Sequence, residues 1–461
     1  MKLSAIVQYA NSNRNRYVEE LKELVKIASI SGSPEHKEEV KLCARFLRDK
    51  MEEIGFMRTE LYETSGNPII YGEWLEAPGK PTVLIYGHYD VQPVDPLDMW
   101  ETSPFEPDVR HGKMYGRGTV DDKGQIYIHL KAIESWLKVE DALPLNVKFI
   151  VEGEEEVGSE NLGLFLVKHQ KLLEADVALI SDTPMFRKGM PSICYGLRGL
   201  AYFQINLRGS NQDLHSGSFG GALKNPIHAL TDIVNRLKEK NGRIAIPGFY
   251  DDVVDIGPEE REALAGLPFD EEAYRKEIGA PKLYGESGYS VLENIWCRPT
   301  LDVCGIWGGF TEEGAKTIIP AEAHAKVSMR LVPNQNPEKI GTLFEEYIDS
   351  IVSPEMFVTV DRMHGGKPFL GNTHHYAFEA ARKALERGFG AQTVYIREGG
   401  SIPVLQTLSD SLNLPCLLIG FGLPNENAHA PNEWLDLENY HKGILSIIYL
   451  YMELSEIESS L

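Results

Sequence analysis

Short apolar runs alternate with helical patterns over much of the chain. Thr82 to Tyr86, Asn146 to Val151 and Val177 to Ile180 are compact, largely aliphatic runs of the kind that forms buried strands. Gln125 to Leu137 has helical spacing, and Pro415 to Phe421 is a further apolar run near the end of the chain. Strands separated by helices predict an open α/β sheet.

Two amphipathic helices are predicted before this sheet. Apolar residues recur at helical spacing from Tyr17 to Ala28 and again from Val40 to Ile54. Ser33 and Pro34 suit the N-cap and first turn of the second helix, and Gly55 suits its end. The chain is therefore expected to form helix first and sheet second.

The hydrophobic period changes near residue 199. Leu200 to Leu207 and Ala323 to Val332 alternate apolar and polar residues, as half-exposed antiparallel strands do. Residues 225–240 and 337–352 have the pattern of amphipathic helices. We therefore predict an inserted α+β domain. The predicted division is residues 1–198 and 371–461 for the α/β domain and 199–370 for the insertion.

Composition restricts the class of protein without identifying it. A chain of 461 residues is too long for one ordinary core, which agrees with two domains. The net charge of -22 argues against nucleic acid or an anionic membrane as a partner. We expect neither a signal peptide nor a membrane span. The five cysteines contain no CxxC pair, so reduced thiols in a cytoplasmic protein are expected.

Candidate chemistry gathers where the predicted strands end. His88 and Asp90 follow the first run and point the same way, since residues two apart in extended chain share a face. The acidic stretch EGEEEVGSE, Asp182 and His429 follow later runs. Each candidate ligand is thus expected just past the carboxyl end of a strand, where sites form in open α/β sheets. Taken singly, such a motif is more often a solvated loop or an acidic helix start than a ligand set.

Asp121 and Asp122 form a second acidic segment inside a stretch that contains three glycines. Imidazoles and carboxylates crowded in one crevice stay ionised only beside strong positive charge, which a divalent metal supplies. Nitrogen and oxygen ligands suit zinc, with manganese or cobalt acceptable. One carboxylate between two ions would hold them roughly 4 Å apart, so that both could activate one water. An adjacent glutamate could then act as general base.

Eight motifs together resemble those of a known family. The segments are GHYDVQP, YGRGTVDDKG, EGEEEVGSE, SDTP, DLHSGSFGG, MRLVPNQNP, REGGSIPV and NAHAPNE. They are similar to motifs of the M20 metallopeptidases, most closely the dipeptidase branch that includes cytosolic nonspecific dipeptidase and carnosinase. The resemblance implies a zinc-peptidase-like catalytic domain with a mixed, largely parallel sheet. It also implies an inserted ferredoxin-like lid that makes a homodimer.

The resemblance implies two metal sites that share Asp121. His88 and Asp182 would complete one site, and Glu156 and His429 the other. Zinc is the expected metal at both sites, with manganese as the alternative.

Two further residues are expected to serve catalysis. Glu155 would be the general base, and Asp90 would steady His88. The acidic run here has three glutamates where the family usually has two, and the register set by Gly158 and Ser159 makes Glu154 the extra one. A slip of one position would exchange base and ligand. The family also implies a cis peptide between Asp121 and Asp122.

Six residues are expected to bind substrate by the same resemblance. His215 would reach the partner subunit's active site and stabilise the oxyanion, and Arg330 would pair with the substrate's terminal carboxylate. The remaining positions that match the substrate site are Thr317, Glu398, Gly400 and Ser401.

The predicted function is metal-dependent hydrolysis of dipeptides or short peptides. Attack by a hydroxide held between two metal ions, with Glu155 as general base, is the expected chemistry. A deacylase of N-acyl amino acids would use the same metal core and remains an alternative. A non-catalytic relative of the fold is a third, less favoured one, because all the ligands and the base are present.

Overall fold

The computed structural model describes residues 2–400 and 402–456, and the chain forms two compact units. Unit 1 contains Met1–Tyr195, Gly371–Ile396 and Pro403–Leu461, and unit 2 contains Gly196–Leu370 and Arg397–Ile402. Separate hydrophobic cores account for the division, one in each unit.

Unit 1 is built on a mixed sheet with the strand order β1-β2-β6-β3-β7-β17-β8. The neighbours β6, β3, β7 and β17 run parallel, whereas β1, β2 and β8 pair antiparallel at the two sides. The bounds are β1 (Arg58–Tyr62), β2 (Ile69–Trp74), β3 (Thr82–His88), β6 (Asn146–Glu152), β7 (Val177–Ile180), β8 (Ser192–Leu197) and β17 (Cys416–Leu418). The central strands are buried throughout, as parallel strands covered on both faces are. The predicted mixed α/β sheet is confirmed.

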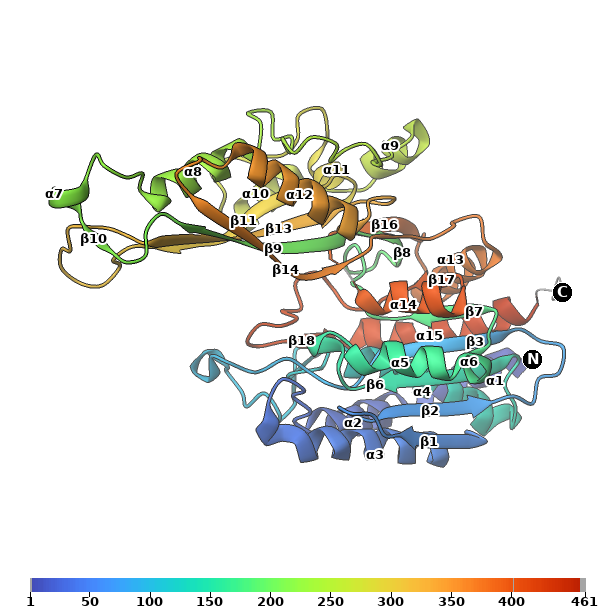
Figure 1. Cartoon of the computed structure of the whole chain (residues 1–461). Helices are drawn as coiled ribbons and strands as arrows, with labels where there is room; N and C mark the ends of the chain where they lie inside the picture. Colours follow the sequence, from blue (N-terminus) through green and yellow to red (C-terminus); the bar gives the residue numbers. More distant parts are fainter. Residues whose placement is uncertain (1, 401, 457–461) are drawn as a thin grey trace. The chain divides into compact units, whose positions relative to one another are not determined.

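Helices cover both faces of this sheet. Figure 1 shows α5, α6 and α14 in front of the sheet and α4 and α15 behind it. Helix α4 is buried along most of its length, because α1, α2, α3 and α15 pack around it. The bounds are α1 (Lys2–Ser12), α2 (Arg14–Val25), α3 (Lys37–Ile54), α4 (Lys123–Glu140), α5 (Glu160–Lys168), α6 (Gln170–Leu173), α13 (Tyr376–Phe389), α14 (Pro403–Leu412) and α15 (Leu437–Ser455).

A small second sheet in unit 1 joins distant segments. Its order is β18-β5-β4, with β4 (Asp108–Arg110), β5 (Lys113–Tyr115) and β18 (Trp434–Asp436). Trp434 pairs with Tyr115, so the turn after β5 lies beside the loop that precedes β18. This pairing brings two of the predicted motifs together.

The N-terminal helices differ from the predicted ones in their bounds. Helix α1 was not expected, and it buries Ile6 and Ala10 in the core. Helix α2 ends at Val25, three residues before Ala28. Ser33 begins a short 3₁₀ turn instead of capping α3. The prediction failed here because a polar Asn-Ser-Asn stretch hid a helix whose stability comes from packing.

Unit 2 has an antiparallel sheet with the order β11-β13-β9-β14. The bounds of its main elements are β9 (Gly199–Arg208), α8 (Pro226–Arg236), β11 (Thr300–Gly308), β13 (Glu322–Leu331), α12 (Pro337–Ile351) and β14 (Phe357–Gly366). Helices α8 and α12 pack on one face, where the alternating apolar residues of β9 and β13 are buried (Figure 1). The chain order βαββαβ with this strand order is the ferredoxin-like arrangement, as expected.

The rest of unit 2 consists of short elements. The segment between α8 and β11 carries three short helices. The bounds are β10 (Leu214–His215), α7 (Ser216–Phe219), α9 (Pro258–Ala265), α10 (Glu271–Glu277), α11 (Val291–Trp296), β12 (Ile318–Ile319), β15 (Phe369–Leu370) and β16 (Val394–Glu398). Strand β16 spans the boundary, because residues 394–396 belong to unit 1 and residues 397–398 to unit 2.

Two further observations concern the chain as a whole. Among the helices of the described residues, none is both long and apolar enough to cross a bilayer. The five cysteines are free thiols; four are buried and Cys304 is exposed.

Candidate metal centre

Four of the five predicted ligands follow strands of the large sheet. His88 is the last residue of β3, Glu156 lies in the 3₁₀ turn after β6, and Asp182 comes two residues after β7. His429 lies in the loop between β17 and β18. Asp121 is the exception, because it immediately precedes Asp122, the N-cap of α4. The expectation that each ligand follows a strand is wrong for Asp121, which the start of a buried helix holds in place.

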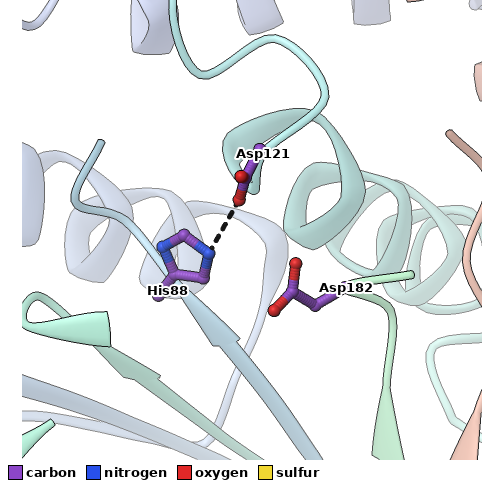
Figure 2. A group of neighbouring side chains, drawn as sticks. All are labelled: His88, Asp121 and Asp182. Atoms are coloured by element: carbon purple, nitrogen blue, oxygen red, sulfur yellow. Dashed lines mark hydrogen bonds and ion pairs between the residues drawn. The ribbon is translucent and has the colours of Figure 1, made fainter. Parts of the chain in front are cut away.

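The side chains of these five residues meet in unit 1. His88 Nε2 lies 3.1 Å from Asp121 Oδ1, and His429 Nε2 lies 2.8 Å from Asp121 Oδ2 and 3.2 Å from Glu156 Oε2. Ligand atoms of His88, Asp121 and Asp182 all lie within 4.8 Å of one another, as do those of Asp121, Glu156 and His429. Figure 2 shows the first group, with the Asp182 carboxylate directed toward the His88–Asp121 pair. Asp121 therefore belongs to both groups.

The position of His88 identifies which ring nitrogen could bind a metal. His88 is fully buried, and its Nδ1 lies 3.1 Å from the backbone carbonyl oxygen of Asp90. A carbonyl oxygen can only accept, so Nδ1 donates to it, and Nε2, which faces Asp121, is the nitrogen that could bind a metal once it has lost its own proton. The Asp90 carboxylate also lies 3.4 Å from Nδ1.

The same Asp90 carboxylate holds the turn that carries the two glutamates. Its oxygens accept hydrogen bonds from the backbone N–H of Glu155 at 3.3 Å and of Glu156 at 3.1 Å. Gln92 Nε2 donates to Glu156 Oε2 at 2.7 Å and so fixes the direction of that carboxylate. Asp90 thus contacts both the His88 ring and the backbone of the Glu155–Glu156 pair.

The acidic run separates into residues with different surroundings. Glu154 accepts hydrogen bonds from the Asn67 backbone N–H at 2.8 Å and from the Asn161 side chain, outside the ligand groups. Burial raises the pKa of Glu155 to about 7, and the Glu156 and Asp121 carboxylates add to the rise while His88 opposes it. Glu154 therefore bonds to its own loop, whereas Glu156 belongs to a ligand group and Glu155 is the acid next to it.

The protonation of the cluster shows how its charges are balanced without a cation. Burial, followed by the Asp121 carboxylate, raises the pKa of Asp182 well above its ordinary value. Hydrogen bonds to Asp121 and Glu156 raise the pKa of His429 to about 10. Although burial opposes it, the two histidines hold the pKa of Asp121 below its usual range. Imidazoles and carboxylates packed this closely strongly shift one another's pKa values, and the donor set of nitrogen and carboxylate oxygen fits divalent cations.

An apolar pocket adjoins the ligands within unit 1. It has a volume of about 190 Å³, and the carboxylates of Asp121 and Asp182 form part of its wall. Its apolar lining comes from Val120, Pro184, Leu423, Pro424 and Ala428. The pocket can hold a small organic group beside the candidate metal centre.

The predicted substrate residues lie in unit 2. His215 pairs with Ile318 across β10 and β12, and the Thr317 carbonyl accepts a hydrogen bond from the Ser216 N–H at 3.0 Å, so His215 and Thr317 are neighbours. Arg330 lies on β13 opposite Thr300.

The predicted substrate residues near β16 form a second group. Glu398 ends β16, and burial raises its pKa to about 7. Gly400 is exposed, and Ser401 lies outside the described residues. Figure 1 shows α7 and β10 at the opposite end of unit 2 from β16, so the unit does not bring His215 and Glu398 together.

Several residues that contact the ligands were not predicted. Arg117, Glu433 and Gln92 are buried or half-buried and bond to ligand residues or to their loops. Each lies inside a motif quoted above, so the motifs contained the signal. The sequence interpretation looked for metal ligands and overlooked these residues. Side chains that only hydrogen-bond to a ligand residue or its loop have no characteristic spacing in the sequence.

Two groups of nitrogen and carboxylate donors that share one aspartate define a dinuclear metallohydrolase type of site on an α/β fold. A family model described as "Peptidase family M20/M25/M40" matches residues 84–453. The chain belongs to this family, and the expected cis peptide between Asp121 and Asp122 is present.

Three relatives match nearly all of the chain. The Cys-Gly metallodipeptidase dug1 of Schizosaccharomyces pombe is 35% identical over 472 residues, covering 99% of each chain. The crystal structure of human carnosine dipeptidase 1 has a TM-score of 0.84 and 31% identity, covering 99% of each chain. An M20 family metallo-carboxypeptidase of Sulfolobus solfataricus, Sso-CP2, has a TM-score of 0.86 and 32% identity, covering 96% of this chain and 99% of that one.

Proposed function

We propose that this protein is a metal-dependent dipeptidase that uses two divalent ions, with zinc as the metal and manganese as the alternative. The observation that carries the proposal is that Asp121 lies within bonding reach of two histidines, as a member of two separate ligand groups. The full-length similarity to metallodipeptidases favours peptide hydrolysis over the deacylase alternative. The identities of the metals and the roles of individual residues are part of the proposal.

Each of the two proposed metal ions has three ligands, and Asp121 is common to both sets. His88, Asp121 and Asp182 hold one ion, and Asp121, Glu156 and His429 hold the other. Bound ions of this kind polarise the scissile carbonyl and lower the pKa of water.

Proton transfer is assigned to Glu155. A carboxyl group whose pKa is near 7 can take the proton from the attacking water and return it to the leaving amine. Asp90 positions this base, because its carboxylate accepts the Glu155 backbone N–H.

Substrate orientation is assigned to residues of unit 2. Arg330 binds the substrate's terminal carboxylate through charge-assisted hydrogen bonds. Thr317, Glu398, Gly400 and Ser401 contact the remainder of the substrate. His215 stabilises the oxyanion in the active site of the partner subunit, so the proposed active form is a homodimer. We propose a cytoplasmic location, which suits five free thiols.

A carboxypeptidase is the second candidate function. It is favoured by the similarity to Sso-CP2, which is as high as that to the dipeptidases. The two activities share metal centre and terminal carboxylate recognition, and they differ in the length of peptide accepted.

The test is a substrate panel on protein loaded with zinc or manganese. Cys-Gly and β-Ala-His, a tripeptide, and N-acetyl amino acids are compared before and after treatment with a chelator. A dipeptidase cleaves dipeptides much faster than the tripeptide and loses activity to the chelator. Faster release of the last residue of the tripeptide selects the carboxypeptidase, and cleavage confined to N-acetyl amino acids contradicts both.

A further inference from the structure

A fully buried carboxylate, Glu433, accepts four hydrogen bonds from one turn of unit 1. Its Oε1 accepts the backbone N–H of Val120 at 2.9 Å and of Asp121 at 3.2 Å. Its Oε2 accepts the Gly118 N–H at 3.0 Å and Arg117 Nη1 at 2.8 Å. One side chain therefore satisfies three backbone N–H groups of the turn that carries the shared ligand Asp121.

Arg117 connects this carboxylate to a third segment. The guanidinium is also buried, and its Nη2 donates to the Pro93 carbonyl at 3.0 Å, five residues after His88. It lies over the Trp100 ring at 5.5 Å. The ion pair thus neutralises the buried Glu433 and links the loop after β3 to the turn before α4.

Glu433 itself belongs to the loop that carries His429, four residues earlier. Its backbone carbonyl accepts the Gly116 N–H at 3.0 Å, next to the β5–β18 pairing. The three loops that supply His88, Asp121 and His429 are therefore joined through one buried ion pair. None of these bonds involves a ligand side chain, so they leave the ligand atoms free.

We propose that the Arg117–Glu433 pair is a preformed clasp that holds the Asp121 carboxylate between the His88 and His429 imidazoles before any metal binds. Glu433 is a positioning residue, since it acts through the backbone of Asp121. The inference rests on the proposed function, because that function supplies the two metal ions that the ligands would hold. Second-layer partners of this kind contribute 10- to 100-fold to metal affinity in other proteins.

The test variant is Glu433→Gln. A Gln carbonyl can still accept the Val120 and Asp121 N–H groups, but its NH₂ then faces the Arg117 and Gly118 donors, so the turn must shift. We expect the affinity for the more weakly bound Mn²⁺ to fall about 10- to 100-fold in calorimetric titration. We also expect the exchange-coupled electron paramagnetic resonance signal of the Mn²⁺ pair to be lost.

The matched control is Glu134→Gln, which removes another buried carboxylate of unit 1. Glu134 accepts Lys131 Nζ at 2.7 Å and pairs with Arg16, away from the ligands. This variant loses stability through a broken buried ion pair but keeps both Mn²⁺ affinities within about twofold of wild type. Unchanged Mn²⁺ affinities in Glu433→Gln, or equal losses in the two variants, contradict the clasp.

A measurement on the wild-type chain keeps the proposal testable if Glu433→Gln does not fold. In metal-free protein, hydrogen exchange within residues 116–122 is expected to be slow at four amides that Glu433 already binds, those of Gly116, Gly118, Val120 and Asp121. If these amides exchange as fast as unprotected amides in metal-free protein and slow only after Mn²⁺ is added, the result contradicts a preformed clasp. If wild type binds two Mn²⁺ ions but cleaves no peptide, the proposed function is wrong. The Mn²⁺ affinities and the exchange rates still test whether the Arg117–Glu433 pair acts as a clasp.

Discussion

At the scale of single residues, neighbouring carboxylates have separate tasks because their environments differ. Asp90 accepts two backbone N–H groups and faces the proton-bearing nitrogen of His88. Glu154 bonds to loop residues, whereas Glu155 is buried with a raised pKa. Adjacent acids in one acidic run can therefore be assigned from their partners, although their sequence context is nearly the same.

Glu155→Gln is predicted to lower kcat about 100- to 10,000-fold, the range for loss of a general base. Glu155 belongs to neither ligand group, so metal content should remain two ions per chain. The measurement is kcat on Cys-Gly together with metal analysis of the same sample.

Glu154→Gln is the control for the register of the acidic run. Its amide oxygen can still accept the Asn67 N–H, so we expect kcat within about threefold of wild type. If Glu154→Gln loses activity and Glu155→Gln retains it, the register is off by one and the base is wrongly assigned.

His129 is predicted to make stability depend on pH. Burial lowers the pKa of His129 to about 3, below its ordinary 6.5, and its Nε2 lies 2.8 Å from Ser181 Oγ. Between these pH values the unfolded chain binds a proton that the folded chain does not. The free energy of unfolding therefore falls as pH decreases through this range and does not change on this account above it.

The expected size of the His129 effect follows from the pKa difference. At pH 5 the loss relative to pH 7.5 is about 2 kcal/mol, from 1.36 kcal/mol per pKa unit. His129→Leu should lack this part of the loss, as measured by urea unfolding of metal-free protein at both pH values. If the free energy of unfolding has the same pH dependence in variant and wild type, the pKa of His129 does not differ between the folded and the unfolded chain.

At the scale of elements, the close contact of β3 with α4 places His88 near Asp121. Gly87 makes the approach possible, because a Cβ there would lie 2.1 Å from Ile126 Cγ2 and 2.9 Å from Asp122 Oδ2. The Asp122 carboxylate also accepts the His88 backbone N–H at 3.3 Å. Strand end and helix start are thus in direct contact at the candidate site.

Gly87→Ala is predicted to destabilise the protein by about 1–3 kcal/mol, the usual cost of overpacking. It should also weaken Mn²⁺ binding, since His88 at the end of β3 and Asp121 just before α4 are proposed ligands of the same ion. Gly366→Ala in β14 is the control, because a Cβ at Gly366 meets nothing within 4 Å. Urea unfolding and calorimetric titration of both variants give the comparison, and wild-type values for Gly87→Ala would contradict the packing account.

At the scale of the whole molecule, two separate cores permit the division of labour that we propose. Unit 1 contains both ligand groups, and unit 2 contains the residues proposed to bind substrate. Strand β10, which ends at His215, lies at the opposite end of unit 2 from β16, which ends at Glu398 (Figure 1), and this is the arrangement expected if His215 serves another subunit.

Mixing two inactive variants tests that arrangement. His215→Ala and Glu155→Gln are each expected to have little activity alone. In a mixed dimer, the chain with intact Glu155 receives His215 from its partner. Random assembly makes half of the dimers mixed, each with one working site, so coexpression should restore about a quarter of wild-type activity. No recovery, in dimers shown to be mixed by affinity tags, contradicts a shared site.

The hydrophobic pattern and the motifs by themselves determined the class of fold and the candidate ligands. Val177–Ile180 was predicted to the residue, and the change of hydrophobic period near residue 199 predicted the α+β character of the insertion. Strand and helix periods are local properties that a short window of residues displays, which is why these predictions were confirmed. Helix α1 escaped prediction because its stability comes from packing against α4 and α15.

Only the tertiary structure decided which atoms meet. It placed Asp121 between two histidines whose positions in the chain differ by 341 residues, 429 minus 88. It also joined Arg117 to Glu433 in a buried pair and gave Glu154 and Glu155 different surroundings. These are distances between segments remote in sequence, set by the β5–β18 pairing and by the packing of α4. Local hydrophobic periodicity contains no information about such distances, because they depend on how the whole core packs.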